Sequence, residues 1–447
     1  MESTVIGYDE NLENFEVNAP YLIYQGEFIL KKGEHELILV GEIFFNWLPD
    51  SHLSFRAEAQ SELDPISVIN ITMLIGVTTL NINDQEIGTC INITQHSELN
   101  GLFEGKLNKY KILGDSSREV EKVSFYVPNL SYISGIPVVW PGKSAGLQRL
   151  IFTNQEYSII IEQNSKFFVN KPKLEKAYGY CIQYYGEVRK NDDGLISYDE
   201  SKKLLSCLSH FLSFINGRRT SALFAKGEIN DNQIWSDFGR YHVDPYKYVT
   251  TWYHDRLNIN LAEMWKRFFS YWYDDDQQYS LRTSIAWYLD ANSNKIHVEG
   301  SIVLAQAALE LLYFWLVPQS NDNGNTESKI LDLLLEIKQS ETIPSELQSL
   351  TDLTNSVLRN KKSNSYTIDN GPKTILEIRN AMTHGNKWRQ DNLKEISTLA
   401  RIDTYILALW YVELSLLFKL GHNGEYNNRS ISIHKKEPAI EDVPWIL

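Results

Sequence analysis

Cysteine is scarce in this chain, which has only Cys90, Cys181 and Cys207 among its 447 residues. These cysteines are odd in number and far apart, which argues against a disulfide framework and against a zinc site built from paired cysteines. The first fifteen residues contain neither a basic stretch nor an apolar run, so they do not form a secretory signal. Both observations predict a protein of the reducing cytoplasm.

Long hydrophobic runs are also absent. The two most apolar stretches, 301–317 and 405–420, are interrupted by Glu310 in the first and by Glu413 and Lys419 in the second. Both are shorter than the roughly 20 apolar residues that a membrane-spanning helix needs. We therefore expect two buried core helices and no membrane partner.

Positive charge is in deficit overall, with 43 Lys and Arg against 57 Asp and Glu and a formal net charge of −14. This balance excludes a generic nucleic-acid coat protein, which would be basic. The segment 359–401 is the exception, because it holds nine basic and four acidic residues. The local excess is explained equally well by a solvated charge run and by a surface that contacts an anion.

The common cofactor motifs are missing too: no Walker loop, no Gly-x-Gly-x-x-Gly and no Gly-x-Ser-x-Gly is present. Asp274–Asp276 are consecutive, so their side chains diverge on a helix, and we interpret them as solvated rather than as metal ligands. His242 and His254 lie among the aromatic residues of 235–273, and we interpret them as core or surface residues rather than as metal ligands. The sequence predicts neither a metal nor a cofactor.

Secondary-structure patterns predict an α+β protein with three regions. Residues 1–195 are rich in β-branched and aromatic residues separated by turn signals, which predicts a β-rich domain of sandwich or barrel type. Residues 196–279 are interpreted as a mixed helical connecting region. Residues 280–447 have helical periodicity and predict an all-α bundle. The expected strands cover 21–30, 35–45, 67–82, 119–130 and 157–163, with a late strand in 179–197.

The helices can be placed more closely. Ser197 and Glu200 form a capping-box pattern that predicts a helix start. In 392–420 apolar residues recur mostly every three or four positions, which predicts one long helix. The expected helices of the bundle are 280–292, 298–317, 328–339, 344–358, 373–384 and 392–420.

The helix expected at 373–384 carries the chemistry of greatest interest. Pro372 suits its start and Gly385 its end, which places His384 in the last turn, where unpaired carbonyls favour a cationic side chain. Arg379 precedes His384 by five residues, a separation of roughly 140° around a helix. Asn380 is four residues from His384 and is expected to orient its ring.

Arginine and histidine together suit cleavage of a phosphodiester without a metal. Histidine moves protons between the 2′-hydroxyl and the leaving oxygen, and the arginine fork matches phosphate oxygens. One histidine does not easily serve as acid and base in the same step, but a symmetric dimer would supply two. A purely structural reading stays open, in which Arg379 pairs with Glu310 or Glu377 and His384 caps carbonyls.

The segment Arg379–His384 resembles the Arg-Asn-x-x-x-His form of the motif in HEPN-domain ribonucleases. Residues 286–316 resemble the opening helices of the ApeA-like HEPN subfamily, and 120–130 and 205–219 resemble its N-terminal region. A strand-rich half followed by a helical domain is also the layout of that subfamily. Motif, helix and layout together cover most of the chain.

The resemblance implies a metal-independent endoribonuclease, a phage-defence (abortive infection) effector of toxin type that acts on RNA as a homodimer or higher symmetric oligomer. Arg379 would bind the scissile phosphate, His384 would act as general acid and base, and Asn380 would position them. Glu310 and Thr383 would support the site. The cations nearest the motif, which are candidates for RNA binding, are Lys373, Lys387 and Arg389.

Under the same resemblance, a phage or host protein would act as a trigger at the N-terminal domain. Two alternatives stay open. In one, the helical domain only dimerises and the β-rich domain recognises a protein or carbohydrate. In the other, the HEPN-like domain acts on nucleotides or as the partner of another enzyme.

Overall fold

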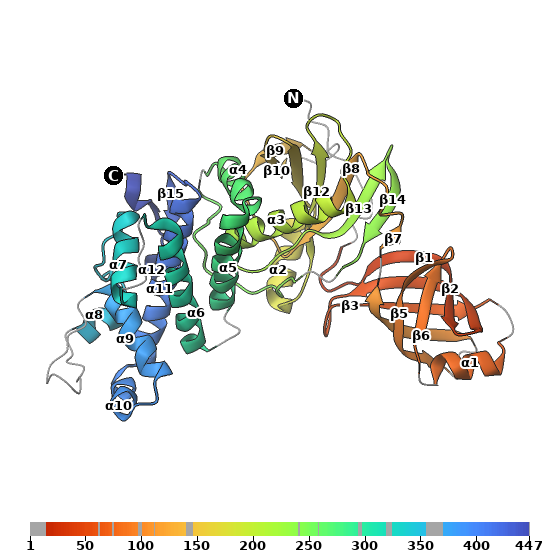
Figure 1. Cartoon of the computed structure of the whole chain (residues 1–447), viewed down its shortest axis with the longest axis horizontal. Helices are drawn as coiled ribbons and strands as arrows, with labels where there is room; N and C mark the ends of the chain where they lie inside the picture. Colours follow the sequence, from red (N-terminus) through yellow and green to blue (C-terminus); the bar gives the residue numbers. More distant parts are fainter. Residues whose placement is uncertain are drawn as a thin grey trace.

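The molecule is elongated, and its three parts follow one another in sequence order: a β-barrel, a central sheet with helices, and a helical domain (Figure 1). This arrangement comes from a computed structural model. It describes residues 15–60, 63–73, 76–96, 101–110, 112–139, 146–239, 242–257, 259–293, 297–318, 324–354 and 370–446.

The first part is a closed antiparallel barrel of the strand order β1-β2-β3-β6-β5-β4. It closes where Leu30 of the first strand pairs with Leu80 of the fourth. Apolar side chains from every strand fill the interior, as expected for a small barrel. Its elements are β1 (Tyr21–Lys32), β2 (His35–Asn46), β3 (His52–Ala59), α1 (Pro65–Thr72), β4 (Thr78–Ile82), β5 (Gln85–Gln95) and β6 (Leu102–Tyr110).

One expected strand of the barrel is partly wrong, because the first half of 67–82 is the helix α1. Asp64 caps this helix by accepting hydrogen bonds from the backbone N–H groups of Ile66 and Ser67, and Pro65 occupies a first-turn position where its missing N–H costs nothing. The cap signal overrides the β-branched composition that favoured a strand. Among the described residues of the range, the strand is β4 at its end.

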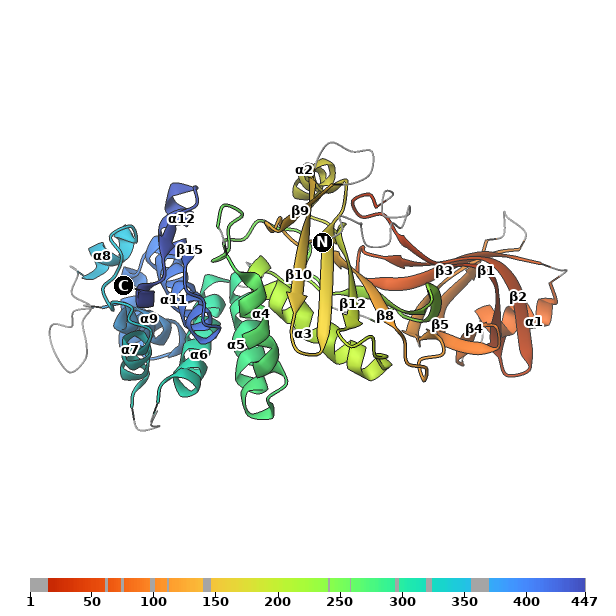
Figure 2. The same cartoon turned by 90° about the horizontal axis from the view of Figure 1, so that it is seen from above.

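The second part is a sheet in which the described strands follow the order β7-β14-β13-β8-β12-β11-β10-β9. The helix α3 and parts of the helical domain cover one face (Figure 2). The strands are β7 (Leu113–Gly114), β8 (Lys122–Pro128), β9 (Ile136–Val139), β10 (Gly146–Thr153), β11 (Tyr157–Gln163), β12 (Ile182–Lys190), β13 (Leu223–Ile229) and β14 (Asn232–Asp237). The helices are α2 (Phe167–Ala177) and α3 (Tyr198–Asn216).

This sheet corrects the expected division of the chain at residue 195. The region 196–279 is not a helical connection, because β13 and β14 lie in it and β13 pairs directly with β8. The expected β-rich domain 1–195 is instead split between the barrel and the central sheet. The capping box at the start of α3 is confirmed, with Ser197 and Glu200 each bonding the other's backbone N–H.

The barrel packs on the central sheet through aromatic rings. Phe224 of β13 stacks on Tyr21 of β1 with ring centroids 4.3 Å apart, and Trp47 stacks on Tyr180 at 5.2 Å. Phe224 has a φ of 54°, and the pairing of β13 with β8 shifts register at this point. A left-handed conformation costs a bulky residue roughly 1–2 kcal/mol. This left-handed conformation turns the Phe224 ring out of the sheet and into the core of the barrel.

The third part begins at α4 and is predominantly helical. Its core is continuous with that of the central sheet. The C-terminal residues return along it as a short hairpin and a small helix. The elements are α4 (Leu261–Trp272), α5 (Asp275–Asn292), α6 (Val298–Leu316), α7 (Thr326–Glu336), α8 (Gln348–Thr354), α9 (Gly371–Thr383), α10 (Lys387–Glu395), α11 (Thr398–Lys419), β15 (Glu425–Asn427), α12 (Arg429–Lys435), β16 (Ile440–Asp442) and the 3-10 turn η2 (Pro444–Ile446).

Most expected helices of this part are present, with one correction. The range 392–420 is not a single helix, because α10 ends at Glu395 and the side chain of Ser397 caps a new helix, α11, by accepting from the N–H of Ala400. The helix α6 is long and apolar enough to span a membrane by length and composition. It packs against α5 and α11 inside the domain, which is the expected position of a core helix. The expected helix 344–358 is seen as α8, and 355–369 lies outside the described residues.

Candidate functional site

The Arg-Asn-x-x-x-His segment lies at the end of α9, in the turn that leads to α10. The helix starts as expected, with Asn370 as its cap and Pro372 in its first turn, and it ends at Thr383. It packs against α6, α7 and α11. Ile375, Ile378 and Ala381 form its buried stripe, so the motif residues between them are directed toward the domain surface.

Arg379 is half-buried and has no acidic partner among the described residues. Its Nη1 donates to Oδ1 of Asn380 over 3.1 Å, and its Nε is buried without any hydrogen-bond partner. The expected alternative, an ion pair with Glu310 or Glu377, is not formed. A guanidinium whose charge no carboxylate neutralises is suited to an anionic partner.

His384 is exposed and follows the helix directly. Its backbone is extended (φ −105°, ψ 124°), although its N–H still donates to the carbonyl of Asn380 over 3.1 Å. The sequence placed His384 in the last turn, but the helix ends one residue earlier and the extended backbone at His384 frees its imidazole from helical geometry. The expected bond from the Asn380 amide to the His384 ring is not formed, and Oδ1 of Asn380 accepts from Arg379 instead.

The two residues expected to support the motif differ in position. Thr383 donates its hydroxyl to the carbonyl of Arg379 over 3.0 Å and so secures the last turn of α9. The carboxylate of Glu310 accepts from Gln306 at 2.9 Å and from Thr326 at 2.7 Å. These partners belong to α6 and α7, so Glu310 joins those two helices and does not contact the motif.

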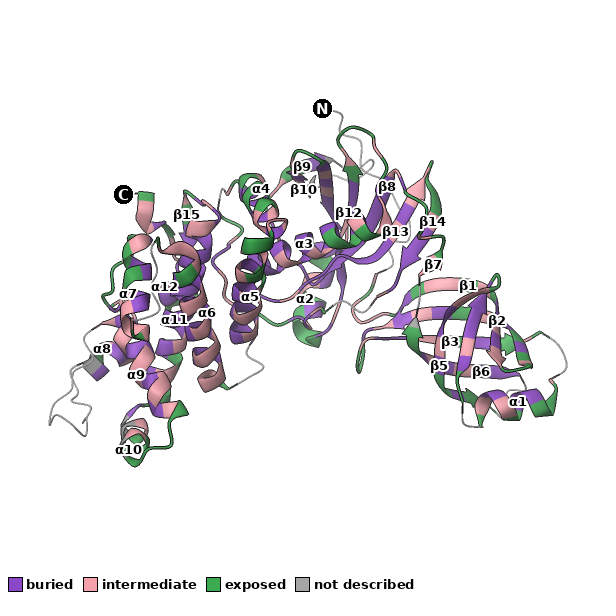
Figure 3. Ribbon diagram, viewed as in Figure 1, coloured by how far each residue is buried: buried purple, intermediate pink, exposed green. Residues whose placement is uncertain are grey.

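The expected RNA-binding cations separate into two groups. Lys387 and Arg389 lie in the first turns of α10, directly after the turn that carries His384. Lys373 is ten residues before Thr383 on α9, roughly 15 Å away along the helix axis. Figure 3 shows exposed residues around α10 and the turn before it. The remaining basic residues of the segment 359–401 include Arg359, Lys361 and Lys362, which lie outside the described residues.

Other candidate groups are structural. The three cysteines are free and buried, and burial raises the pKa of Cys181 to about 11 and that of Cys90 to about 12, so neither thiol is an activated nucleophile. Asp274 caps α5 by accepting from the N–H of Asp276. Trp235 and Trp252 are fully buried and serve the core.

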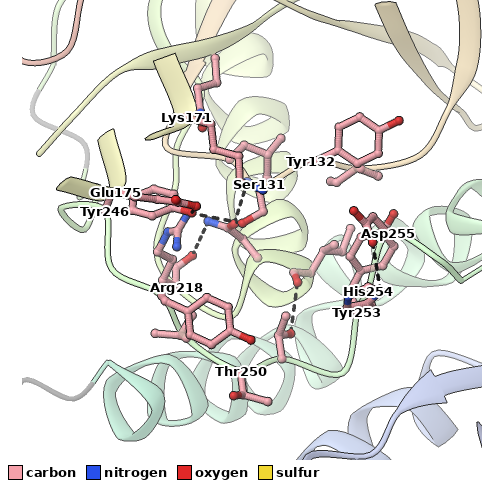
Figure 4. Close-up of a pocket in the computed structure, with 18 of the residues that line it drawn as sticks. Ser131, Tyr132, Lys171, Glu175, Arg218, Tyr246, Thr250, Tyr253, His254 and Asp255 are labelled. Atoms are coloured by element: carbon pink, nitrogen blue, oxygen red, sulfur yellow. Dashed lines mark hydrogen bonds and ion pairs between the residues drawn. The ribbon is translucent and has the colours of Figure 1, made fainter. Parts of the chain in front are cut away.

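The structure adds one site that sequence patterns did not reveal. A cavity of about 190 Å³ lies between the central sheet and the helical domain, and its wall includes the buried Arg218 (Figure 4). Its lining comes from residues 130–133 after β8, from α2, from Gln183 of β12, from the end of α3 and the turn after it, from Asn427 of β15, and from residues 246–255, which we call the joint segment. These pieces are distant in sequence and follow no spacing rule, so only the fold brings them together.

Comparison with known proteins finds similarity to described families in two of the three parts. Residues 115–249 match the family described as the YopA central domain, and residues 274–438 match the YopA C-terminal domain. These ranges correspond closely to the central sheet with its joint segment and to the helical domain from α5 onward. The barrel lies outside both matches.

The chain is also similar over its whole length to a curated protein. It is 24% identical over 460 residues to the SPbeta prophage-derived uncharacterized protein YopA of Bacillus subtilis (strain 168), and the alignment covers 98% of each chain. No solved structure shows significant similarity to this chain.

Proposed function

We propose that the chain is a metal-independent endoribonuclease of the HEPN type, with its active site at the end of α9. The observation that carries the proposal is the state of Arg379. Asn380 holds its guanidinium, no described carboxylate neutralises it, and the exposed His384 follows one turn later. A merely structural arginine at a helix end would be expected to pair with an acid.

The residues divide the reaction between them. Arg379 binds the non-bridging oxygens of the scissile phosphate and stabilises the extra negative charge of the pentacoordinate transition state. The His384 imidazole takes the proton from the attacking 2′-hydroxyl or gives one to the leaving 5′-oxygen. The products are a cyclic 2′,3′-phosphate and a free 5′-hydroxyl, so the balance needs no water and no metal in this step.

A second copy of the chain supplies the other histidine. Support comes from the start of α11, where Leu399 and Ile402 are 67% and 37% exposed and lie on one face of the helix. These apolar side chains follow α10 and so lie at the same end of the domain as the motif. A two-fold contact through them brings two α9 ends together.

The biological role we propose is a cytoplasmic phage-defence effector whose trigger, a phage or host protein, binds the barrel. The helix α1 supports this, because Ile66, Ile69 and Met73 form an exposed apolar face on it. The curated relative is prophage-derived, and this origin supports a role in defence against other phages. The barrel lies at the opposite end of the molecule from α10 (Figure 1), which suits a sensing role rather than RNA contact.

The test is RNA cleavage by the purified full-length chain in the presence of EDTA, alone and with lysate of phage-infected cells. We expect cleavage that leaves cyclic phosphate ends. His384→Ala and Arg379→Ala should each reduce the rate at least about 100-fold. His96→Ala, which removes a half-exposed imidazole of the barrel, is the matched control and should cleave normally.

Circular dichroism and thermal unfolding must show that each variant is folded. Cleavage that survives His384→Ala would remove the proposed catalytic residue. A folded dimer that cuts no RNA in either condition would favour the second candidate, a non-catalytic dimeric binding protein. That candidate rests on the apolar faces of α1 and α11, which need no active site.

A further inference from the structure

The helix α2 carries positive charge on a molecule whose formal net charge is −14. The segment 166–178, which contains α2 and the residue on each side of it, has four lysines and one glutamate. The helix lies at the margin of the central part in both views (Figure 1, Figure 2). Figure 3 shows exposed residues on it. A basic surface is therefore presented to solvent, far along the chain from the motif on α9.

Helical periodicity separates a buried face of α2 from an outer face. Phe167, Asn170 and Leu174 are buried, and their spacing of three and four residues places them on one side of the helix. Five exposed residues occupy the opposite side in two adjacent rows. The rows, which we call the outer face, are Phe168–Pro172–Lys176 and Val169–Lys173.

The N-terminal end of the outer face is apolar. Phe168 and Val169 are 61% and 60% exposed although they are neighbours in the chain. The Phe168 ring lies against Phe167 and Tyr132, with centroids 5.2 and 5.6 Å apart, so its other side is open to solvent. Single exposed apolar residues are normal, but a contiguous group is typical of a surface that contacts a partner.

The C-terminal end of the outer face is cationic. Lys173 and Lys176 form no ion pair with any residue in the described part of the chain. The carboxylate of α2, Glu175, lies on the flank toward the cavity, where it accepts from the Tyr246 hydroxyl at 3.3 Å (Figure 4). The charges of these lysines are thus available to an anionic partner.

Single-stranded nucleic acid combines the two features that this face complements. Its phosphates attract lysines, and each unpaired base has a flat surface that stacks on an aromatic ring. A double helix keeps its bases paired inside, so an exposed phenylalanine favours a single strand. Tyr178, at the C-terminal end of α2, is 67% exposed and offers a second ring.

We propose that the outer face of α2 binds single-stranded RNA, with the phosphates at Lys173 and Lys176 and a base on Phe168. This face then serves as a second contact for the substrate of the α9 site, a role that rests on the proposed function. It holds a long RNA against the central part and takes no part in the chemical step. Its effect is therefore on substrate affinity, and only for strands long enough to reach both places.

The experiment is fluorescence anisotropy of the full-length His384→Ala chain with a labelled oligouridine of about 16 nucleotides. We expect Phe168→Ala to weaken binding at least about fivefold, because a stacked base is lost. The double variant Lys173→Ala, Lys176→Ala should lower the slope of log affinity against log salt by about 1.4, or about 0.7 for each contact. These side chains are exposed, so the variants should fold.

Two matched controls should bind as the parent does. Tyr279→Ala removes a ring of α5 that is 66% exposed, and Lys109→Ala removes an exposed lysine of the barrel. A duplex of the same length should bind at least about fivefold more weakly than the single strand. Binding that both sets of variants leave unchanged, or a preference for the duplex, would overturn the proposed surface.

Vesicles of phosphatidylserine and phosphatidylcholine provide the other anionic partner to be tested, by sedimentation. Vesicle binding that Phe168→Ala abolishes, without any binding of RNA, would assign the outer face to a membrane and overturn the proposal. In the cleaving chain, Phe168→Ala should raise KM for a long RNA but not for a dinucleotide, with kcat unchanged in both.

The outcomes separate this surface from the α9 site. RNA binding that depends on Phe168 in a chain that never cleaves RNA would support the surface and refute the proposed ribonuclease. Cleavage that depends on His384, with RNA affinity indifferent to every α2 variant, would refute the surface and leave the ribonuclease standing.

Discussion

Arg429 and Glu413 form a fully buried ion pair in the helical domain. Nε and Nη2 of the arginine donate to the two carboxylate oxygens over 2.8 and 2.7 Å, and both side chains are 0% exposed. The hydroxyl of Tyr288 donates to the same carboxylate at 2.6 Å, and Nη2 of Arg429 also bonds Thr250 of the joint segment. This cluster joins α5, α11 and α12 at their common centre.

Removing one member of this pair should destabilise the chain strongly, because the other charge would remain buried alone. We expect Glu413→Gln to lower the free energy of unfolding by about 3–5 kcal/mol. Glu263→Gln, which breaks the exposed Glu263–Lys266 pair on α4, should cost less than about 0.5 kcal/mol. Urea unfolding followed by circular dichroism measures both, and a similar loss in the two variants would contradict the account.

Asn380 should act as a positioning residue, since its side chain holds Arg379 rather than any substrate atom. Asn380→Ala should reduce kcat about 10- to 100-fold with little change in KM, because the guanidinium loses its placement but keeps its charge. Asn380→Asp keeps the geometry and neutralises the cation, so it should raise KM for RNA. Steady-state kinetics separate the two, and equal effects of both variants on kcat and KM would refute the role.

The two groups of cations predict different salt dependences for RNA binding. Lys387→Ala should lower the slope of log affinity against log salt by about 0.7, the value for one contact to single-stranded nucleic acid. Lys373→Ala should leave the slope unchanged, because that residue lies at the far end of α9. Fluorescence anisotropy with the non-cleaving His384→Ala chain is the measurement. Equal slopes for the two variants would place the RNA elsewhere.

Dimerisation through the start of α11 can be tested by introducing a charged side chain at the proposed contact. Leu399→Glu should weaken the dimer at least tenfold, because contact would bury an unpaired carboxylate. Leu335→Glu is the matched control, as that leucine of α7 is 78% exposed but distant along the chain from the motif. Sedimentation velocity reports the dimer fraction, and RNA cleavage should fall with it. A dimer that withstands Leu399→Glu would require another interface.

Acid should destabilise the folded chain through its buried histidines. Burial lowers the pKa of His422 below its ordinary value of 6.5, and it lowers that of His210 as well. The unfolded chain then binds protons that the folded chain does not, so stability is fully present above pH 6.5 and is lost as the pH falls from there toward the folded-state pKa values. Each histidine contributes a slope of up to about 1.4 kcal/mol per pH unit.

Thermal unfolding between pH 5 and 8 tests this directly. The double variant His210→Gln, His422→Gln should show a smaller loss of stability over the acid half of that range than the parent chain. An unchanged slope would assign the acid sensitivity to other groups.

The sequence predicted elements well where local signals were strong and unopposed. The capping box at Ser197, the helix start at Pro372 and most helix boundaries depend on nearby residues, so one sequence suffices for them. The sequence does not indicate α1, because its apolar residues follow a pattern typical of a strand and the cap at Asp64 is the one helical signal. The sequence also does not indicate the break before α11, because the apolar stripe continues across Ser397.

The candidate site was predictable only as a list of residues. Spacing indicated that Arg379 and His384 belong together, but the partner of Asn380 is a choice between two nearby side chains that geometry alone decides. The sequence does not indicate the partners of Glu310, because they depend on how α6 and α7 pack. The Arg218 cavity could not be predicted, since its wall is assembled from segments with no common periodicity.

The out-turned ring of Phe224 has a consequence for how the chain can be divided. The unfavourable backbone conformation of Phe224 is compensated only while the barrel buries its ring, because Phe224 and its neighbour Tyr126 fill the base of that barrel. A shortened protein that starts after the barrel would expose these rings to water as an apolar patch that promotes aggregation. Anyone preparing fragments should therefore keep the barrel attached, or replace Phe224 with a small polar residue when removing it.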